Sequence, residues 1–161
     1  MLKNLSLTLK LALLPAVALL GLLLYVGAHA ETHRLDDSAS QIVSAERNMR
    51  WVAPLPGRSG NNDVVTRVVV NVSIDTSSWI GRTGRVFMIL PSDGEPPVSA
   101  QWATQGRLLP GRLISGERGL VFSGTITKPR LEDQFVVDIK TDGRWMSPRR
   151  RMNFHFELDI D

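Results

Sequence analysis

The residues with the clearest chemical potential lie near the end of the chain, where His155, Glu157 and Asp159 alternate with apolar residues. Alternation places one imidazole and two carboxylates, all common metal ligands, on one face of a predicted strand. Side chains two apart on a strand are separated by about 6.8 Å, so a single ion needs them to converge. An outward polar row, continued by Arg151 and Asn153, explains the pattern more simply, and we predict no cofactor.

A second cluster is basic: Arg149, Arg150 and Arg151 follow Arg144 and Trp145. Guanidinium groups bind carboxylate, sulfate and phosphate, and an exposed Trp can anchor a partner. We therefore predict a contact site for an acidic protein face or an anionic polysaccharide, with a solvated hairpin tip as the alternative. Three adjacent arginines are too few for a nucleic-acid footprint, so nucleic acid is not an expected partner.

Enzymatic motifs are missing from the sequence. There is no Cys, which excludes disulfides, thiolate zinc sites and a cysteine nucleophile. No G-x-S-x-G elbow and no phosphate-binding G-x-x-x-x-G-K-[ST] loop occurs. The acidic pairs Asp93 with Glu95 and Glu132 with Asp133 are typical of solvated turns. We predict a protein that is not an enzyme, with a hydrolase or a metal-assisted enzyme centred on His155 as the alternatives.

Charge and composition describe an ordinary globular chain. The 161 residues are 43% hydrophobic, which is typical of a folded domain and unlike a disordered one. The net charge is +3, but Lys3 and Lys10 belong to the N-terminal segment. Beyond residue 30, 17 Lys and Arg face 16 Asp and Glu, a net charge of only +1. This balance argues against a polyanion-binding protein.

The first thirty residues have the pattern of an export signal. Residues 11–28 are uncharged and follow the basic residues Lys3 and Lys10, and Ala28-His29-Ala30 matches a signal-peptidase site. As a helix, 18 residues reach about 27 Å, just short of a hydrocarbon core of about 30 Å. Residues 1–30 are thus a signal peptide cleaved after Ala30 or an anchor that holds the protein in the membrane. Both interpretations predict an extracytoplasmic protein, periplasmic or at the cell surface.

Residues 31–62 change character before the main domain begins. Leu35, Ile42 and Met49 fall seven residues apart, which predicts a short amphipathic stalk helix within 35–49. The stretch from Pro54 to Asn62 is rich in Pro, Gly and Asn and predicts a linker.

From residue 63 to 161 the apolar residues alternate as in strands. We expect a long strand over 64–75 and a last one over 152–160, with further strands over 85–90, 98–104, 112–115, 120–127 and 135–141. The Asp142-Gly143 pair predicts a hairpin with a short return strand over 144–146. The fold class is therefore all-β. We expect an immunoglobulin-like antiparallel β-sandwich of about seven strands, with a small β-barrel as the alternative.

These observations lead to two functional hypotheses. The first is a non-enzymatic, extracytoplasmic interaction or assembly component of a cell-envelope or surface structure. It would contact a protein partner through residues 144–151 and the Ser92–Pro97 loop. The alternative is a glycan-binding module that stacks sugars on exposed Trp51, Trp79 or Trp145 and binds acidic groups with Arg.

Overall fold

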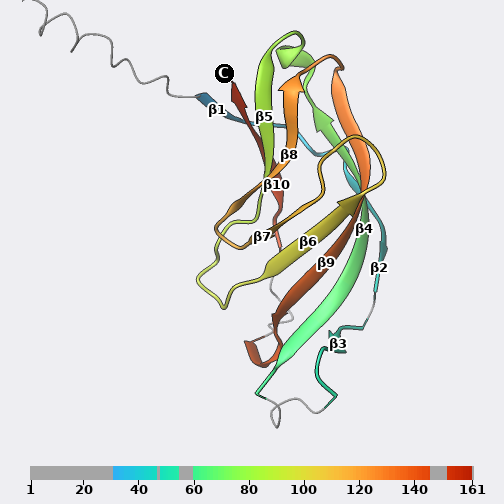
Figure 1. Cartoon of the computed structure of the whole chain (residues 1–161), viewed down its shortest axis with the longest axis vertical. Helices are drawn as coiled ribbons and strands as arrows, with labels where there is room; N and C mark the ends of the chain where they lie inside the picture. The colour runs from blue at the N-terminus through green and yellow to red at the C-terminus, as the bar shows by residue number, and fades with distance from the viewer. Residues whose placement is uncertain (1–30, 47, 55–59, 146–151, 161) are drawn as a thin grey trace, which may run out of the picture.

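The chain folds into two antiparallel β-sheets (Figure 1). The computed structural model describes residues 31–46, 48–54, 60–145 and 152–160. Sheet A has four strands in the spatial order β1 (Glu31–Arg34), β10 (His155–Ile160), β5 (Thr83–Ile89) and β8 (Arg118–Thr125). Sheet B has the order β2 (Gln41–Ala45), β4 (Asp63–Asp75), β9 (Arg130–Asp142), β6 (Ser99–Thr104) and β7 (Gly111–Ile114), and β3 (Arg50–Trp51) also pairs with β4.

Helical structure is limited to two short turns in these residues, η1 (Ser77–Trp79) and η2 (Gly143–Trp145). No helix within the described ranges is long and apolar enough to cross a bilayer. The apolar helix expected over 11–28 lies outside those ranges, as do residues 146–151.

Strands β4 and β9 form the longest strand pairing in sheet B. All 13 residues of each strand are in register, from Asp63 opposite Asp142 to Asp75 opposite Arg130. Most of the inward positions of β4 carry β-branched residues, which suit a pleated, half-buried surface. The inward side chains at both ends of β4 are buried, among them Val64, Val72 and Ile74.

The core lies between the two sheets and takes residues from both. Sheet A contributes Val86, Val121 and Leu158, each with no exposed surface, and sheet B contributes Ile74 and Phe135. This arrangement confirms the all-β sandwich predicted from the alternation, but the described residues form ten strands rather than about seven.

One side of the sandwich is closed by Trp102. Its indole N–H donates to the carbonyl of Leu109 at 2.9 Å, and its ring lies against the backbone of Gly111 in β7 and Gly119 in β8. A Cβ at Gly119 would come within 2.4 Å of the ring. Trp102 in sheet B therefore packs directly on a strand of sheet A, and glycine is required at that contact.

The stalk helix predicted within 35–49 is wrong. β1 pairs with β10 and β2 pairs with β4, so this segment supplies one edge strand to each sheet. Leu35 lies between these strands and is a buried core residue. Two heptads are too short to stabilise an isolated helix, whereas pairing with two existing strands satisfies the backbone. The sandwich therefore includes strands from Glu31 onward and does not start only at residue 63.

The return strand predicted over 144–146 is also not formed, because η2 begins at Gly143. Both sides of β9 are already occupied near its end, by β4 and by β6 as far as Lys140. The amide of Gly143 instead donates to the carbonyl of Asn62 at 2.7 Å. A hairpin strand at this point would have no free edge to join.

Candidate functional site

The row His155, Glu157 and Asp159, which the sequence offers only as a weak metal-site candidate, lies on the outer face of sheet A, where Arg118 binds it. Arg118 of β8 donates to the Asp159 carboxylate at 2.7 Å and lies 3.6 Å from Glu157. His155 contacts Glu157 at 3.3 Å. The part of the chain that the structure describes contains no group of three or more potential ligands arranged to hold a metal ion.

Asp159 is the centre of this row because three strands meet at its carboxylate. Thr32 of β1 donates its hydroxyl to Asp159 at 2.7 Å, from the side opposite Arg118. The Arg118 guanidinium also lies 4.1 Å from the centre of the Phe87 ring, in a cation–π contact. Hydrogen bonding to Arg118, reinforced by Thr32, lowers the pKa of Asp159, and the same carboxylate raises the pKa of Arg118. The row joins β1, β10 and β8 and has a structural role.

The predicted basic contact site is described only at its start. Arg144 forms a close ion pair with Asp142 at 2.6 Å, and this contact lowers the pKa of the Asp142 carboxyl. The side chain of Trp145 and residues Arg149, Arg150 and Arg151 lie outside the described part, so that prediction stays open. The Ser92–Pro97 loop connects β5 to β6, and most of its residues are exposed.

The tryptophans have different surroundings. Trp102 is buried, and Trp79 is half-buried with its ring centre 4.4 Å from that of His33. Trp51 is 47% exposed and lies beside Gly143. Among the tryptophans whose side chains are described, only Trp51 offers an exposed ring.

The surface that stands out instead is one edge of sheet B. β2 and β3 pair one after the other with β4 and together form what we call the β2–β3 edge, residues 41–45 and 50–52. Four large hydrophobic side chains are exposed there: Ile42 at 69%, Val43 at 54%, Trp51 at 47% and Val52 at 50%. They make up half of the exposed large hydrophobic residues in the described ranges. Exposed apolar side chains that gather along one sheet edge are candidates for an interaction site.

The β2–β3 edge is interrupted within its longer strand. The register with β4 shifts between Ile42 and Ser44, so Val43 forms a bulge. A bulge limits indiscriminate pairing with other strands, because it breaks the ladder of free backbone groups. A partner at this edge would therefore gain much of its affinity from the apolar side chains.

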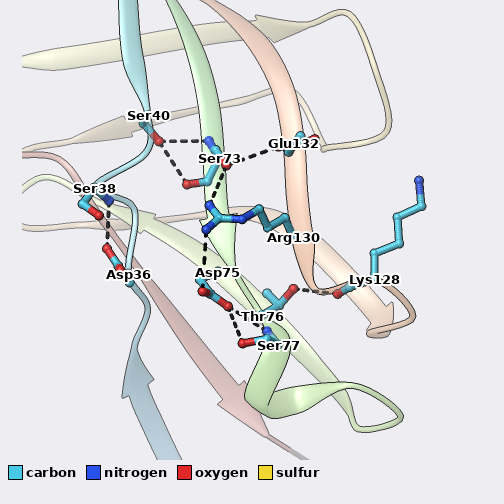
Figure 2. Close-up of polar contacts among 10 residues, drawn as sticks. All are labelled: Asp36, Ser38, Ser40, Ser73, Asp75, Thr76, Ser77, Lys128, Arg130 and Glu132. Atoms are coloured by element: carbon cyan, nitrogen blue, oxygen red, sulfur yellow. Dashed lines mark hydrogen bonds and ion pairs between the residues drawn. The ribbon is translucent and has the colours of Figure 1, made fainter.

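A polar network fixes the start of β2 against β4 (Figure 2). The Ser40 hydroxyl accepts a hydrogen bond from the Ser73 amide at 2.9 Å and donates to the Ser73 carbonyl at 3.3 Å. Arg130 of β9 donates to the Ser73 hydroxyl at 3.2 Å and lies 3.9 Å from Asp75. Hydrogen bonds from Ser77 lower the pKa of the Asp75 carboxyl. The edge is therefore held in place before any partner arrives.

A pocket of about 800 Å³ lies behind the same edge, between the two sheets. Its apolar lining residues come from β2, β4 and β9 of sheet B and from β5, β10 and the segment before β10. Val68 and Val70 face this space and are only half-buried, although Val72 on the same strand is 4% exposed. The sandwich is thus closed by Trp102 on one side and incompletely filled beside β2.

Sequence reasoning missed both the edge and the pocket. The adjacent β-branched residues Ile42 and Val43 were a strand signal, but the seven-residue spacing around them favoured a helix. The pocket depends on how the sheets separate, for which the sequence has no local signal. No family model matches the chain, and no curated protein or solved structure matches it.

Proposed function

We propose that this protein is a non-enzymatic interaction or assembly component that works outside the cytoplasm, in a cell-envelope or surface structure. The observation that carries the proposal is the concentration of exposed apolar side chains on the β2–β3 edge. The proposal includes an apolar helix over 11–28, as signal peptide or membrane anchor, ahead of an immunoglobulin-like sandwich.

The partner we infer is a protein that places apolar side chains on this edge and adds a short strand beside β2. Strand addition combines main-chain hydrogen bonds with side-chain contacts on the flanking surface. Among the described strands β2 pairs only with β4, which leaves its other side for an added strand. Trp51 and Val52 would supply the apolar anchors, as aromatic residues often do at interfaces.

Site-specific photocrosslinking in cells tests this proposal. A photoreactive residue at Val43 or Val52 should yield one discrete adduct with a different protein, and the same residue at Ile80 or Leu109 should not. These controls are matched, since both are exposed hydrophobic residues away from the edge. Trp51→Ala should reduce the adduct at least fivefold. Equal adducts at all four positions, or an adduct only with a second copy of the chain, would contradict the proposal.

The basic segment provides a separate test of a charged contact. Replacing Arg149, Arg150 and Arg151 together with Ala should weaken association with an acidic partner and reduce its dependence on salt. A salt titration of the purified complex measures both effects. An unchanged salt dependence would remove these arginines from the interface and leave the apolar edge unaffected.

A further inference from the structure

The pocket between the sheets differs from the β2–β3 edge because it is concave and lies inside the sandwich. Its volume of about 800 Å³ is within the range of small-molecule sites, roughly 300–1,000 Å³. The walls include Val72 and Met88, buried side chains from opposite sheets, and Val70, which is half-buried. A space with apolar walls from both layers can surround a ligand rather than support it from one side.

The chemistry of the walls restricts what can occupy the pocket. The lining residues of β4 and β9 are all Val, Phe and Ile, with no polar side chain among them. A peptide strand inserted there would bury amide groups without side-chain partners, at a cost of about 1–3 kcal/mol for each unpaired group. An aliphatic chain has no such groups. The interior therefore fits a hydrocarbon chain better than a polypeptide.

The charges of the lining lie on one side. Arg34 at the end of β1 and Asp37 in the connection to β2 are its two formally charged residues, one of each sign, and neither forms an ion pair within the described chain. Ser40, Asn153 and His155 add polar groups to the lining. A ligand that fits this distribution is uncharged along its buried length and carries a polar head with no net charge.

We propose that the inter-sheet pocket binds one single-chain amphiphile, with its hydrocarbon chain between the sheets and a net-neutral polar head near Arg34 and Asp37. This ligand site is distinct from the protein-binding edge, although Ile42 borders both, and either function can exist without the other. The ligand we expect is a free amphiphile rather than a lipid held in a bilayer, because one chain fits a pocket of this size.

Calorimetric titration of the full-length protein with alkylphosphocholines tests the proposal, with each probe kept below its micelle concentration. Binding should saturate at one probe per chain. The affinity should rise about three- to fourfold for each added methylene, as expected for CH₂ burial, and then stop rising when the pocket is full. Alkyl carboxylates and alkyltrimethylammonium ions of the same length should bind at least fivefold more weakly.

Two matched pairs of variants locate the binding. Val70→Trp fills the pocket and should weaken binding at least tenfold, whereas Leu120→Trp on the exposed face of β8 should leave it unchanged. Ile42→Glu places a charge at the exposed margin of the lining and should also weaken binding, whereas Ile80→Glu at another exposed isoleucine should not. Ile42 is 69% exposed, so Ile42→Glu should fold normally. It therefore still tests the proposal if Val70→Trp does not fold.

Several results would overturn the proposal. Binding that is insensitive to both Val70→Trp and Ile42→Glu would place the probe elsewhere on the chain. Affinity that never levels off with chain length would indicate adsorption rather than a pocket. Stronger binding of the charged probes would contradict the neutral head. If an apolar peptide bound saturably and no alkyl probe did, the ligand would be a protein segment rather than an amphiphile.

Discussion

Asp159 shows how a single residue can join three strands. It is 7% exposed although the alternation of β10 places it on the outer face, because Arg118 and Thr32 cover its carboxylate. A carboxylate in this position is stabilised by charge-assisted hydrogen bonds, which are stronger than neutral ones. Its contribution to stability therefore depends on its remaining ionised.

The lowered pKa of Asp159 predicts a loss of stability in acid. Because this pKa is lower in the folded than in the unfolded chain, the stabilisation is present above the unfolded-state pKa of about 4. It is lost as pH falls through the folded-state pKa. Asp159→Asn should lower the free energy of unfolding by about 1–3 kcal/mol at pH 7, and the difference from the parent should shrink toward pH 2. Urea unfolding at a series of pH values measures both.

Asp138 provides the matched control for this effect. It forms a 2.7 Å pair with Arg67, which also lowers its pKa, but both side chains are largely exposed. Exposed pairs of this kind contribute about 0–1 kcal/mol. Asp138→Asn should therefore cost less than Asp159→Asn, and the opposite order would show that the three-strand contact is not important.

The contact between Trp102 and Gly119 predicts a second effect at the residue scale. Gly119→Ala should destabilise the protein by about 2 kcal/mol or more, because the added methyl group overlaps the indole ring. In a Trp102→Phe background, the smaller ring should accommodate the methyl group and reduce that cost. A double-mutant cycle by chemical denaturation measures the coupling. Equal costs in the two backgrounds would contradict the packing described here.

At the scale of elements, the strands before residue 63 are part of the sandwich. A chain that begins at Asp63 lacks β1, β2, β3 and the buried Leu35. Loss of one buried leucine side chain alone costs about 2–5 kcal/mol. We expect this truncated chain to be unfolded, or to unfold at a much lower urea concentration than a chain that begins at Glu31. Circular dichroism during urea titration distinguishes them, and equal midpoints would restore the predicted boundary at residue 63.

The connection between β6 and β7 depends on one carboxylate. Asp133 accepts hydrogen bonds from the amides of Gln105, Gly106 and Leu108 at 2.7–3.1 Å. Asp133→Ala should cost about 2–3 kcal/mol, since the three amides lose a charged acceptor. Glu132→Ala is the control, because Glu132 has one contact of 3.4 Å, to Ser73. Similar thermal shifts for the two variants would contradict this role for Asp133.

How well the sequence predicts a strand depends on the length of that strand and on how far along the chain its pairing partner lies. The alternation over 64–75 is long enough to identify nearly all of β4, whereas the pattern over 135–141 identifies only the second half of β9 (Arg130–Asp142). β1 has only four residues. Its first residue, Glu31, pairs with Ile160 of β10, which lies 129 positions away in the sequence. No local pattern specifies such a pairing. The same limit applies to Asp159, whose burial depends on Arg118, a residue 41 positions away.

At the scale of the whole molecule, the two sides of the sandwich differ in packing. Trp102 fills the side near β7 and β8, and the pocket leaves the side near β2 less filled. Regions with fewer buried contacts open more readily. Hydrogen exchange followed by mass spectrometry should therefore find β4 and β9 best protected and β2 exchanging faster than β7, the edge strand on the other side of sheet B. The same rate for β2 and β7 would indicate a uniformly packed sandwich.

The pairing of β1 with β10 also has a practical consequence for engineering. Glu31 lies opposite Ile160, so the first and last described strands run side by side at one end of the molecule (Figure 1). A few glycines would join them, and new termini could be opened in the exposed Ser92–Pro97 loop. Such a circular permutant would retain every strand pairing, and it would let a reporter be fused at the opposite end of sheet A.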